Sequence, residues 1–423
     1  MYDVLLTGAE THQGMIVIRS LAKRGVRMLV TGSASNSIGF RSRYIAGKAV
    51  LPSAETEKEA FVDRLLKLVE ENGIRYIFPV TETSLIALDE QRQRVDGIAR
   101  LMAPPSDVIR AGMDKKVQIA TALKLNIPTA ETLYPESIDE AEGFAEHVGY
   151  PIIFKPRGRA SDSRIKGSFN FKVHYCHNRP QLREFLESLS DHVYPMMQSY
   201  AFGQHNQFSC FVENGNDVHS CFQDEMTRML PITGGVGARR LSCPIAPEIL
   251  DYSTRFFKDL NWEGVAQTQW KGPGPDGKYR FIEVSVRIIA SIGSPVFSGV
   301  DLPWMHYQYF TGQKVDRADS FMIGKHSRWF RGDAITVTRH ILGDQPESGD
   351  KLPSKISVLG SWLYDFVRPG LKNDVEAWND PLPGLVELKL LAVDLWRILL
   401  NRLAERFPIL RKMKRWLKAW NKR

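Results

Sequence analysis

The chain has 423 residues, of which 43% are hydrophobic and 25% charged, so it is long enough for two or three folded domains. No run of about 18 residues is free of charge, which argues against a transmembrane helix, and the first residues lack the pattern of a signal peptide. The four cysteines have no CxxC spacing, which argues against a zinc site or a disulfide framework and predicts a reducing, cytoplasmic location.

The net charge of +8 is concentrated at the C-terminal end. Residues 402–423 hold nine basic residues and one acid, so residues 1–401 sum to zero. We therefore expect no nucleic acid and no generic polyanion as a partner for the body of the chain. The basic end, by contrast, is a candidate for binding an anionic surface.

Residues 1–100 alternate strand and helix patterns. The runs YDVLLTG, VRMLVTG and YIFPVTE are typical of strands, and residues 14–24, 61–71 and 84–92 have helical spacing. This alternation predicts a parallel sheet with helices on both faces. The turn TGAETHQG lacks G-x-G-x-x-G, so only the alternation of strands and helices supports the hypothesis of a nucleotide-dependent oxidoreductase. The alternative is a tight turn in a substrate-binding or structural domain.

The prolines Pro104–Pro105 predict a domain boundary. Beyond it we predict a helix over Met113–Leu125, with the acid Asp114 in its first turn. The strand PIIFKP then places Lys155 directly before a basic, polar loop at 157–168. This arrangement suits phosphate, because an ammonium group and loop N–H groups can both contact its oxygens. The alternative is a basic hairpin tip without a ligand.

The stretch 265–286 is typical of a β-hairpin, because a turn rich in Gly, Pro and Asp separates two strand-like runs. On the second run Glu283, Ser285 and Arg287 alternate and therefore share one face of the strand. Pairing of the two strands would place Gln269 beside them. A carboxylate with further oxygen donors and an arginine suits magnesium and triphosphate. The alternative is a polar edge that faces solvent.

Several segments, in the right order, resemble the ATP-grasp superfamily of carboxylate–amine ligases over residues 1–315. The likeness is to the single-chain branch related to carbamoyl-phosphate synthase domains and D-aspartate ligase. The segments are SRY and IFPVTETS near the N-terminus, Asp114–Lys115, PIIFKP, Gln198–Ser199–Tyr200, GGVGARR, and WEGVAQTQWK followed by FIEVSVR. The resemblance implies an α/β fold with a Rossmann-like pre-ATP-grasp domain at 1–105, a two-lobed α+β ATP-grasp domain at 106–315 and a C-terminal helical extension at 316–423.

The resemblance also implies a site for ATP and Mg²⁺. Nucleotide contacts are implied for Lys115, Lys155, Gln198, Ser199, Tyr200 and Gln204, metal contacts for Glu283, Gln269 and Ser285, and contact with the transferring group for Arg287. Arg228 or Arg239 is a candidate receptor for a substrate carboxylate, because arginine binds carboxylates bidentately. The alternative for these two arginines is a salt bridge within the protein.

The implied partners are a small-molecule carboxylate and an amine. The carboxylate would take the γ-phosphoryl group of ATP to give an acyl phosphate, and the amine would displace phosphate to form an amide. Positioning and charge neutralisation carry such chemistry. Four positions depart from the family pattern: Gln269 and Gln204 replace acids, Ser199 replaces a glutamate and Ser285 replaces an asparagine. They support a second hypothesis, a catalytically degenerate protein that binds nucleotide or acts as a scaffold.

The C-terminal part is expected to be helical from Leu385 to Arg406, where Pro408 interrupts the pattern. Over residues 409–420 apolar residues, including two tryptophans, fall on one helical face and basic residues on the other. This pattern is typical of a helix that lies on an anionic membrane. It predicts peripheral association with the inner face of a membrane and a membrane- or envelope-linked substrate. The alternatives are docking on the body or on a second subunit of a homodimer, followed by nucleic acid.

Overall fold

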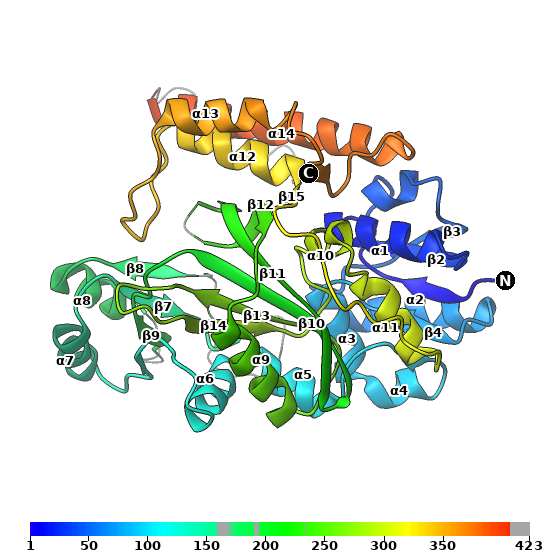
Figure 1. Ribbon diagram of the computed structural model, residues 1–423, viewed down its shortest axis with the longest axis horizontal. Coiled ribbons are helices and arrows are strands. Elements are labelled where there is room, and N and C mark those ends of the chain that lie inside the picture. Colours follow the sequence, from blue (N-terminus) through cyan, green and yellow to red (C-terminus); the bar gives the residue numbers. More distant parts are fainter. Residues whose placement is uncertain (159–168, 170, 172, 190–193, 233, 407–423) are drawn as a thin grey trace.

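The computed structural model describes residues 1–158, 169, 171, 173–189, 194–232 and 234–406, and three β-sheets organise this part of the chain (Figure 1). A five-stranded sheet lies in the N-terminal region, a four-stranded sheet in the middle of the chain, and a seven-stranded sheet joins the middle to the C-terminal part. Most of the predicted loop at 157–168 and the predicted helix at 409–420 lie outside the described residues.

The N-terminal sheet is parallel, with the strand order β3-β2-β1-β4-β5, as the alternation of strands and helices predicted. Helices α1 and α3 begin at threonine caps, since the hydroxyls of Thr11 and Thr81 accept hydrogen bonds from the first turns. The elements are β1 (Val4–Leu6), α1 (His12–Ala22), β2 (Met28–Gly32), a 3₁₀ helix (Ile38–Arg41), β3 (Gly47–Val50), α2 (Lys58–Glu71), β4 (Tyr76–Phe78), α3 (Glu82–Glu90), α4 (Arg92–Asp96) and β5 (Arg100–Leu101).

Two helices, α5 (Ser106–Met113) and α6 (Lys115–Lys124), follow this sheet. The start of the predicted helix Met113–Leu125 is therefore wrong, because Met113 is the last residue of α5. Asp114 between them has an extended backbone, and its side chain accepts a hydrogen bond from the Lys116 N–H. A carboxylate at this position satisfies a free N–H group and suits the positive end of the helix. Asp114 thus separates the two helices, and Lys115 becomes the first residue of α6.

The four-stranded sheet is antiparallel in the order β6-β9-β7-β8. Its apolar residues pack with α7 and α8 in a small core of their own that includes Phe154, Leu182 and Met197. The elements are β6 (Thr132–Leu133), α7 (Ile138–Val148), β7 (Ile152–Lys155), β8 (His174–Cys176), α8 (Arg179–Glu187) and β9 (Met196–Ser199).

The seven-stranded sheet has the order β14-β13-β10-β11-β12-β15-β16. The predicted hairpin forms its edge, with Gln269 opposite Glu283 and Gln267 opposite Ser285. Trp262, Trp270 and Phe281 are fully buried beneath this end of the sheet. The elements are β10 (His205–Gly215), β11 (Asp217–Leu230), β12 (Val236–Ser242), α9 (Pro247–Asp259), β13 (Trp262–Lys271), β14 (Arg280–Ser285), α10 (Gly293–Ser298), α11 (Leu302–Phe310), β15 (His326–Arg328) and β16 (Lys372–Asn373).

Residues beyond 315 contribute to this sheet as well as to helices. β15 and β16 complete it, and α12 (Phe330–Ile341) carries α13 (Lys355–Tyr364) and α14 (Pro381–Arg406) along one edge of the molecule (Figure 1). Asp380 accepts hydrogen bonds from Arg19 and Ser42, which binds the C-terminal part to the N-terminal domain. The domain limits at 105 and 315 remain predictions from the sequence. Within the described residues, no helix is both long and apolar enough to span a membrane.

Candidate active site

A cavity of about 600 Å³ lies between the four-stranded and seven-stranded sheets. Strands of both sheets supply its walls, so side chains that are far apart in the sequence converge on one space. The predicted site residues that line it are Lys115, Lys155, Gln198, Ser199, Tyr200, Gln269, Glu283, Ser285 and Arg287. Gly234 and Gly235 of the predicted glycine-rich element line it as well.

Three lysines face this cavity. Lys155 ends β7, Lys115 begins α6, and Lys271 ends β13. Burial, together with the positive charges of Lys115 and Lys271, lowers the pKa of Lys155 to about 8 against the opposing effect of Glu283. Burial also lowers the pKa of Lys271. Like charges held this close together favour a polyanionic ligand, because its negative charge relieves their repulsion.

Two acids of the cavity lining limit this positive charge. The Lys115 Nζ lies 3.1 Å from Glu283 Oε2. The Lys271 Nζ donates a 2.9 Å hydrogen bond to Tyr200 Oη and lies 3.8 Å from Asp350 Oδ2, to which Tyr200 also donates. The charges of the cavity are therefore arranged between a Glu283 end and a Tyr200 end.

The Tyr200 end also contains His205, which pairs with Lys271 across β10 and β13. Burial lowers the pKa of His205 to about 3, and the charges of Lys271 and Lys155 contribute to this shift. Its imidazole is therefore neutral at physiological pH. A neutral imidazole here can hydrogen-bond a ligand without adding a further positive charge.

A row of oxygen donors crosses three strands at the Glu283 end. Gln207 on β10 lies opposite Gln269 on β13, and Gln269 lies opposite Glu283 on β14. The Gln207 Oε1 is buried and has no hydrogen-bond partner among the described residues. A buried amide oxygen without a partner indicates a missing ligand or water. With Glu283 the row offers one carboxylate and neutral oxygens, a donor set that Mg²⁺ accepts when phosphates supply the rest.

Gln204 does not line the cavity. Its side-chain amide donates a 2.8 Å hydrogen bond to the Met226 carbonyl, which holds it against β11. A contact of this side chain with the nucleotide remains a prediction from the resemblance, and the geometry gives it no support.

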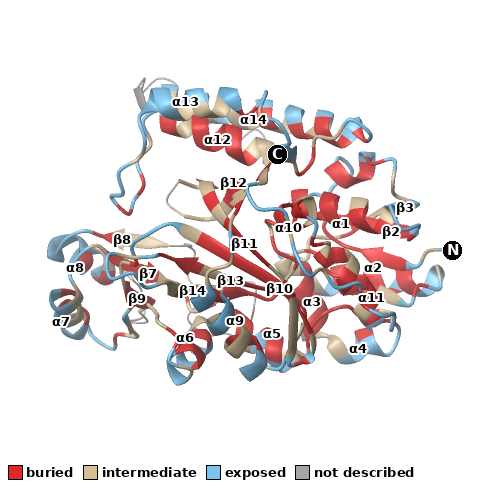
Figure 2. Ribbon diagram, in the orientation of Figure 1, coloured by how far each residue is buried: buried red, intermediate tan, exposed pale blue. Residues whose placement is uncertain are grey.

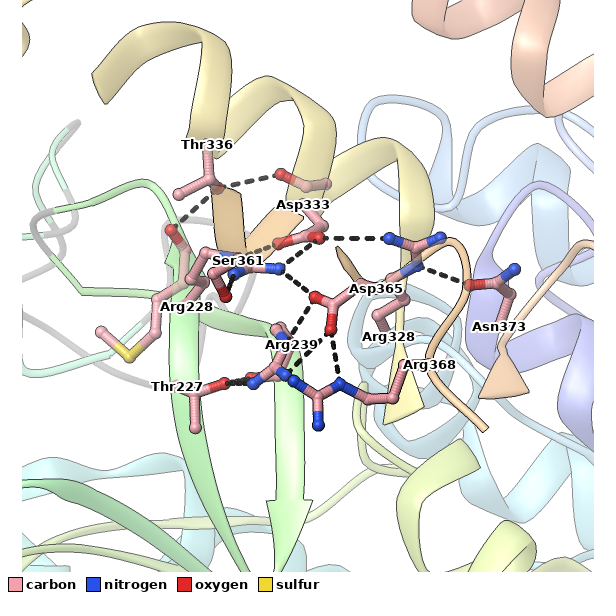
Figure 3. Close-up of polar contacts among 12 residues, drawn as sticks. Thr227, Arg228, Arg239, Arg328, Asp333, Thr336, Ser361, Asp365, Arg368 and Asn373 are labelled. Carbon is pink, nitrogen blue, oxygen red and sulfur yellow. Dashed lines mark hydrogen bonds and ion pairs between the residues drawn. The ribbon is translucent and has the colours of Figure 1, made fainter. Parts of the chain in front are cut away.

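Arg228 and Arg239 are also absent from the cavity wall and join a buried cluster of arginines and aspartates (Figure 3). Arg228 Nε lies 2.5 Å from Asp333 Oδ1, and its Nη2 lies 2.8 Å from Asp365 Oδ2. Arg239 pairs with the same Asp365 at 2.7 and 3.0 Å. This geometry matches the salt-bridge alternative stated for these residues, and their role as carboxylate receptors stays a prediction.

The cluster joins the sheet to the C-terminal helices. Burial alone would raise the pKa of Asp365, but hydrogen bonds from Arg239 and Arg228 outweigh it and hold the pKa below its usual range. Arg368 donates to the same carboxylate, and Arg328 lies 3.9 Å from Asp333 (Figure 3). Four arginines thus share two fully buried carboxylates.

The sequence patterns missed several cavity residues. Lys271 lies two residues beyond Gln269 on the same strand face, so strand alternation could have identified it. His205 and Gln207 alternate in the same way on β10, so strand alternation could have identified them as well. Asp350 gives no such signal. It comes from the connection between α12 and α13, 150 residues from Tyr200, and lines the cavity with Pro346, Ser348 and Leu352.

Comparison with solved structures identifies the architecture. The chain superimposes on the biotin carboxylase domain of *Hydrogenobacter thermophilus* 2-oxoglutarate carboxylase, solved with MgADP, ADP and bicarbonate, with a TM-score of 0.61, 15% identity and coverage of 77% of this chain and 73% of that chain. The chain has the ATP-grasp fold. The *Thermus thermophilus* N5-carboxyaminoimidazole ribonucleotide synthetase shares this fold, with a TM-score of 0.57, 15% identity and coverage of 76% and 81%.

Similarity at the sequence level is narrower. No protein-family model matches the chain. The formate-dependent phosphoribosylglycinamide formyltransferase of *Rhodococcus jostii* is 27% identical over 156 residues, which is 36% of this chain and 36% of that relative. The match therefore spans about a third of the length of this curated relative. The α/β ATP-grasp architecture expected from the sequence segments is confirmed by the structural neighbours.

Proposed function

We propose that the chain is an ATP-dependent ligase that activates a carboxylate and joins it to an amine. The observation that carries this proposal is the convergence of Lys115, Lys155 and Lys271 on one cavity that Glu283 borders. Three lysines that Glu283 and Asp350 balance only in part suit a triphosphate better than a neutral ligand. The ATP-grasp fold supports the proposal, since the structural neighbour from *H. thermophilus* was solved with MgADP in complex.

Each residue then has a defined part. Lys155 and Lys115 hold phosphate oxygens as point charges, and Glu283 with the Gln269 and Gln207 amides holds Mg²⁺. Bound ATP supplies the phosphoryl group that makes the substrate carboxylate reactive toward an amine. Arg287, which lies 3.6 Å from Glu82 and lines the same cavity, is placed to neutralise charge on the transferring group.

The alternative is a protein that binds nucleotide without turnover. The row Gln207, Gln269 and Glu283 favours this alternative, because its single carboxylate already pairs with Lys115. A site with less negative charge binds Mg²⁺ more weakly, because the charge of the ion dominates the local energetics. Both the ligase and the alternative protein bind nucleotide, and only the ligase turns it over.

Calorimetry followed by a turnover assay separates these proposals. We expect Mg·ATP to bind the wild-type protein and Lys155→Met to bind it weakly. Release of ADP and phosphate in the presence of candidate carboxylates and amines would support the ligase. Binding without release across a broad panel of acids and amines would support the alternative. Absence of Mg·ATP binding by the wild-type protein would contradict both.

A further inference from the structure

The helices α13 and α14 expose an unusual amount of apolar surface. Both pack on α12 along one edge of the molecule, and their outer faces point away from the two sheets that form the cavity (Figures 1 and 2). The outer surface includes Ile356 at 85% exposure and Leu363 at 54% on α13, and Leu385 at 60% and Trp396 at 62% on α14. Monomeric proteins rarely leave contiguous apolar patches of this kind uncovered.

The exposed residues of α14 follow a helical period. Leu385, Leu388, Trp396, Leu399 and Leu403 are all exposed and recur at intervals of three, eight, three and four, which places them on one side of the helix. The opposite side of α14 is covered, because Leu391 and its neighbours pack on α12. The helix is therefore apolar on two sides, and only one of them has a partner among the described residues.

Two acids of α14 contact residues at the start of α12. Asp394 pairs with Arg331 of α12 at 2.6 Å, and Glu387 accepts a 2.7 Å hydrogen bond from the Trp329 indole. Lys389 and Arg397, in contrast, are exposed. The outer surface of α14 thus combines apolar and basic side chains, whereas Asp394 and Glu387 of this helix contact Arg331 and Trp329.

The chain continues from α14 into its most basic segment. Residues 407–423 directly follow the helix and contain seven lysines and arginines and no acid. A second copy of the chain carries a segment of the same sign, so it offers no charge complementary to this one. An anionic leaflet offers such charge, which contributes about 1 kcal/mol per basic residue near the surface.

We infer that the outer faces of α13 and α14 form a docking surface for an anionic lipid bilayer. This inference extends the predicted role of the tail to a folded surface of the described chain and does not depend on turnover at the cavity. The leucines and Trp396 enter the interface between headgroups and acyl chains, and the basic residues contact the lipid phosphates. The connection from α12 to α13 also lines the cavity at Asp350, so the docking surface and the candidate active site share one segment.

Vesicle flotation of the full-length protein tests the inference. We expect the wild-type chain to float with vesicles of phosphatidylglycerol and phosphatidylcholine and to stay unbound with phosphatidylcholine alone. The double variant Leu385→Glu/Trp396→Glu should reduce the bound fraction at least about ten-fold, because it removes two anchors and adds repulsion. The variant Ile356→Glu/Leu363→Glu tests α13 independently if the first variant fails to fold.

Leu123→Glu is the matched control. Leu123 is 60% exposed on α6, at the side of the molecule opposite α13 and α14 (Figure 1), and its substitution should leave flotation unchanged. The inference is overturned if the wild-type chain does not float, or if both double variants float as well as the wild-type chain. It is also overturned if analytical ultracentrifugation shows a dimer that the double variants dissociate while flotation is unchanged, since the surface would then bind a second copy.

Discussion

Two groups of cations in this protein differ in what they face. Lys115, Lys155 and Lys271 face an open cavity, where burial and mutual repulsion lower the pKa of Lys155 to about 8. Arg228 and Arg239 face Asp333 and Asp365, which hold them in a buried network. In the first group Lys115 and Lys271 each pair with an acid, but Lys155 has no ion pair among the described residues. In the second group both arginines pair with buried carboxylates. The acids around a basic residue therefore separate a binding role from a structural one.

The largest effect is expected on stability, at the arginine–aspartate cluster. Asp365→Ala leaves Arg239 buried without a carboxylate partner and Arg228 with Asp333 alone, so the free energy of unfolding should fall by about 3–5 kcal/mol. Denaturant titration measures it. Asp276→Ala is the control, because its pair with Arg280 lies on the surface, where solvent screens it, and its loss should change stability little. Equal effects of the two variants would contradict a structural role for the cluster.

At the cavity, Lys155→Met should weaken ligand binding without lowering the stability of the fold. The affinity for Mg·ATP should fall by about 1.5–3 kcal/mol, or roughly 10- to 150-fold, because a charge-assisted phosphate contact is lost. The free energy of unfolding should not decrease, because the substitution removes a cation from beside Lys115 and Lys271. Calorimetry and denaturant titration measure the two quantities. Lys278→Met, at an exposed position of the β13–β14 hairpin, should leave both unchanged.

The titration of Lys155 gives the cavity a pH dependence. The free protein has a Lys155 pKa of about 8, and bound phosphate raises this pKa because it stabilises the ammonium form. The affinity for ATP should therefore be constant below pH 8 and fall as the pH rises above 8, by up to about ten-fold per unit. Calorimetry in buffers of different ionisation enthalpy should show proton uptake near pH 8–9. Lys155→Met should abolish both effects, and their persistence would assign them to another group.

The smallest effect is expected at the row of oxygen donors. Gln269→Glu places a second carboxylate opposite Glu283, so affinity for Mg·ATP should rise several-fold. In EDTA the same variant should bind ATP more weakly than the wild-type protein, because the added charge then repels the phosphates. A change of sign between the two conditions supports a metal at this row. The same direction of change in both conditions would argue that the metal lies elsewhere.

Local patterns predicted much of the fold. The period-two alternation of Glu283 and Ser285 and the turn before them predicted a hairpin whose register places Gln269 opposite Glu283. The Lys155 strand and the parallel N-terminal sheet follow from equally local signals. The boundary at Met113 was missed because Asp114 suits both the first turn of a helix and its cap, and only the backbone distinguishes the two.

Long-range partners could not be predicted in this way. The aspartates that pair with Arg228 follow it by 105 and 137 residues, and no local spacing indicates that they meet. Asp350 reaches the cavity from a connection whose sequence carries no nucleotide-binding motif. The sequence around an arginine is therefore the same whether it binds substrate or closes a salt bridge, and the fold decides between the two.

The contacts of Asp380 have a consequence for synthesis of the chain. Arg19 on α1 and Asp380 are separated by 361 residues, yet they are joined in the finished protein. At translation rates of about 5–20 residues per second, α1 leaves the ribosome roughly 20–70 s before its partner exists. During this interval Arg19 lacks its partners at residues 374–380, and the N-terminal sheet also lacks the later strands whose apolar residues share its core. The final arrangement of the first domain is thus completed only when nearly all of the protein has been made.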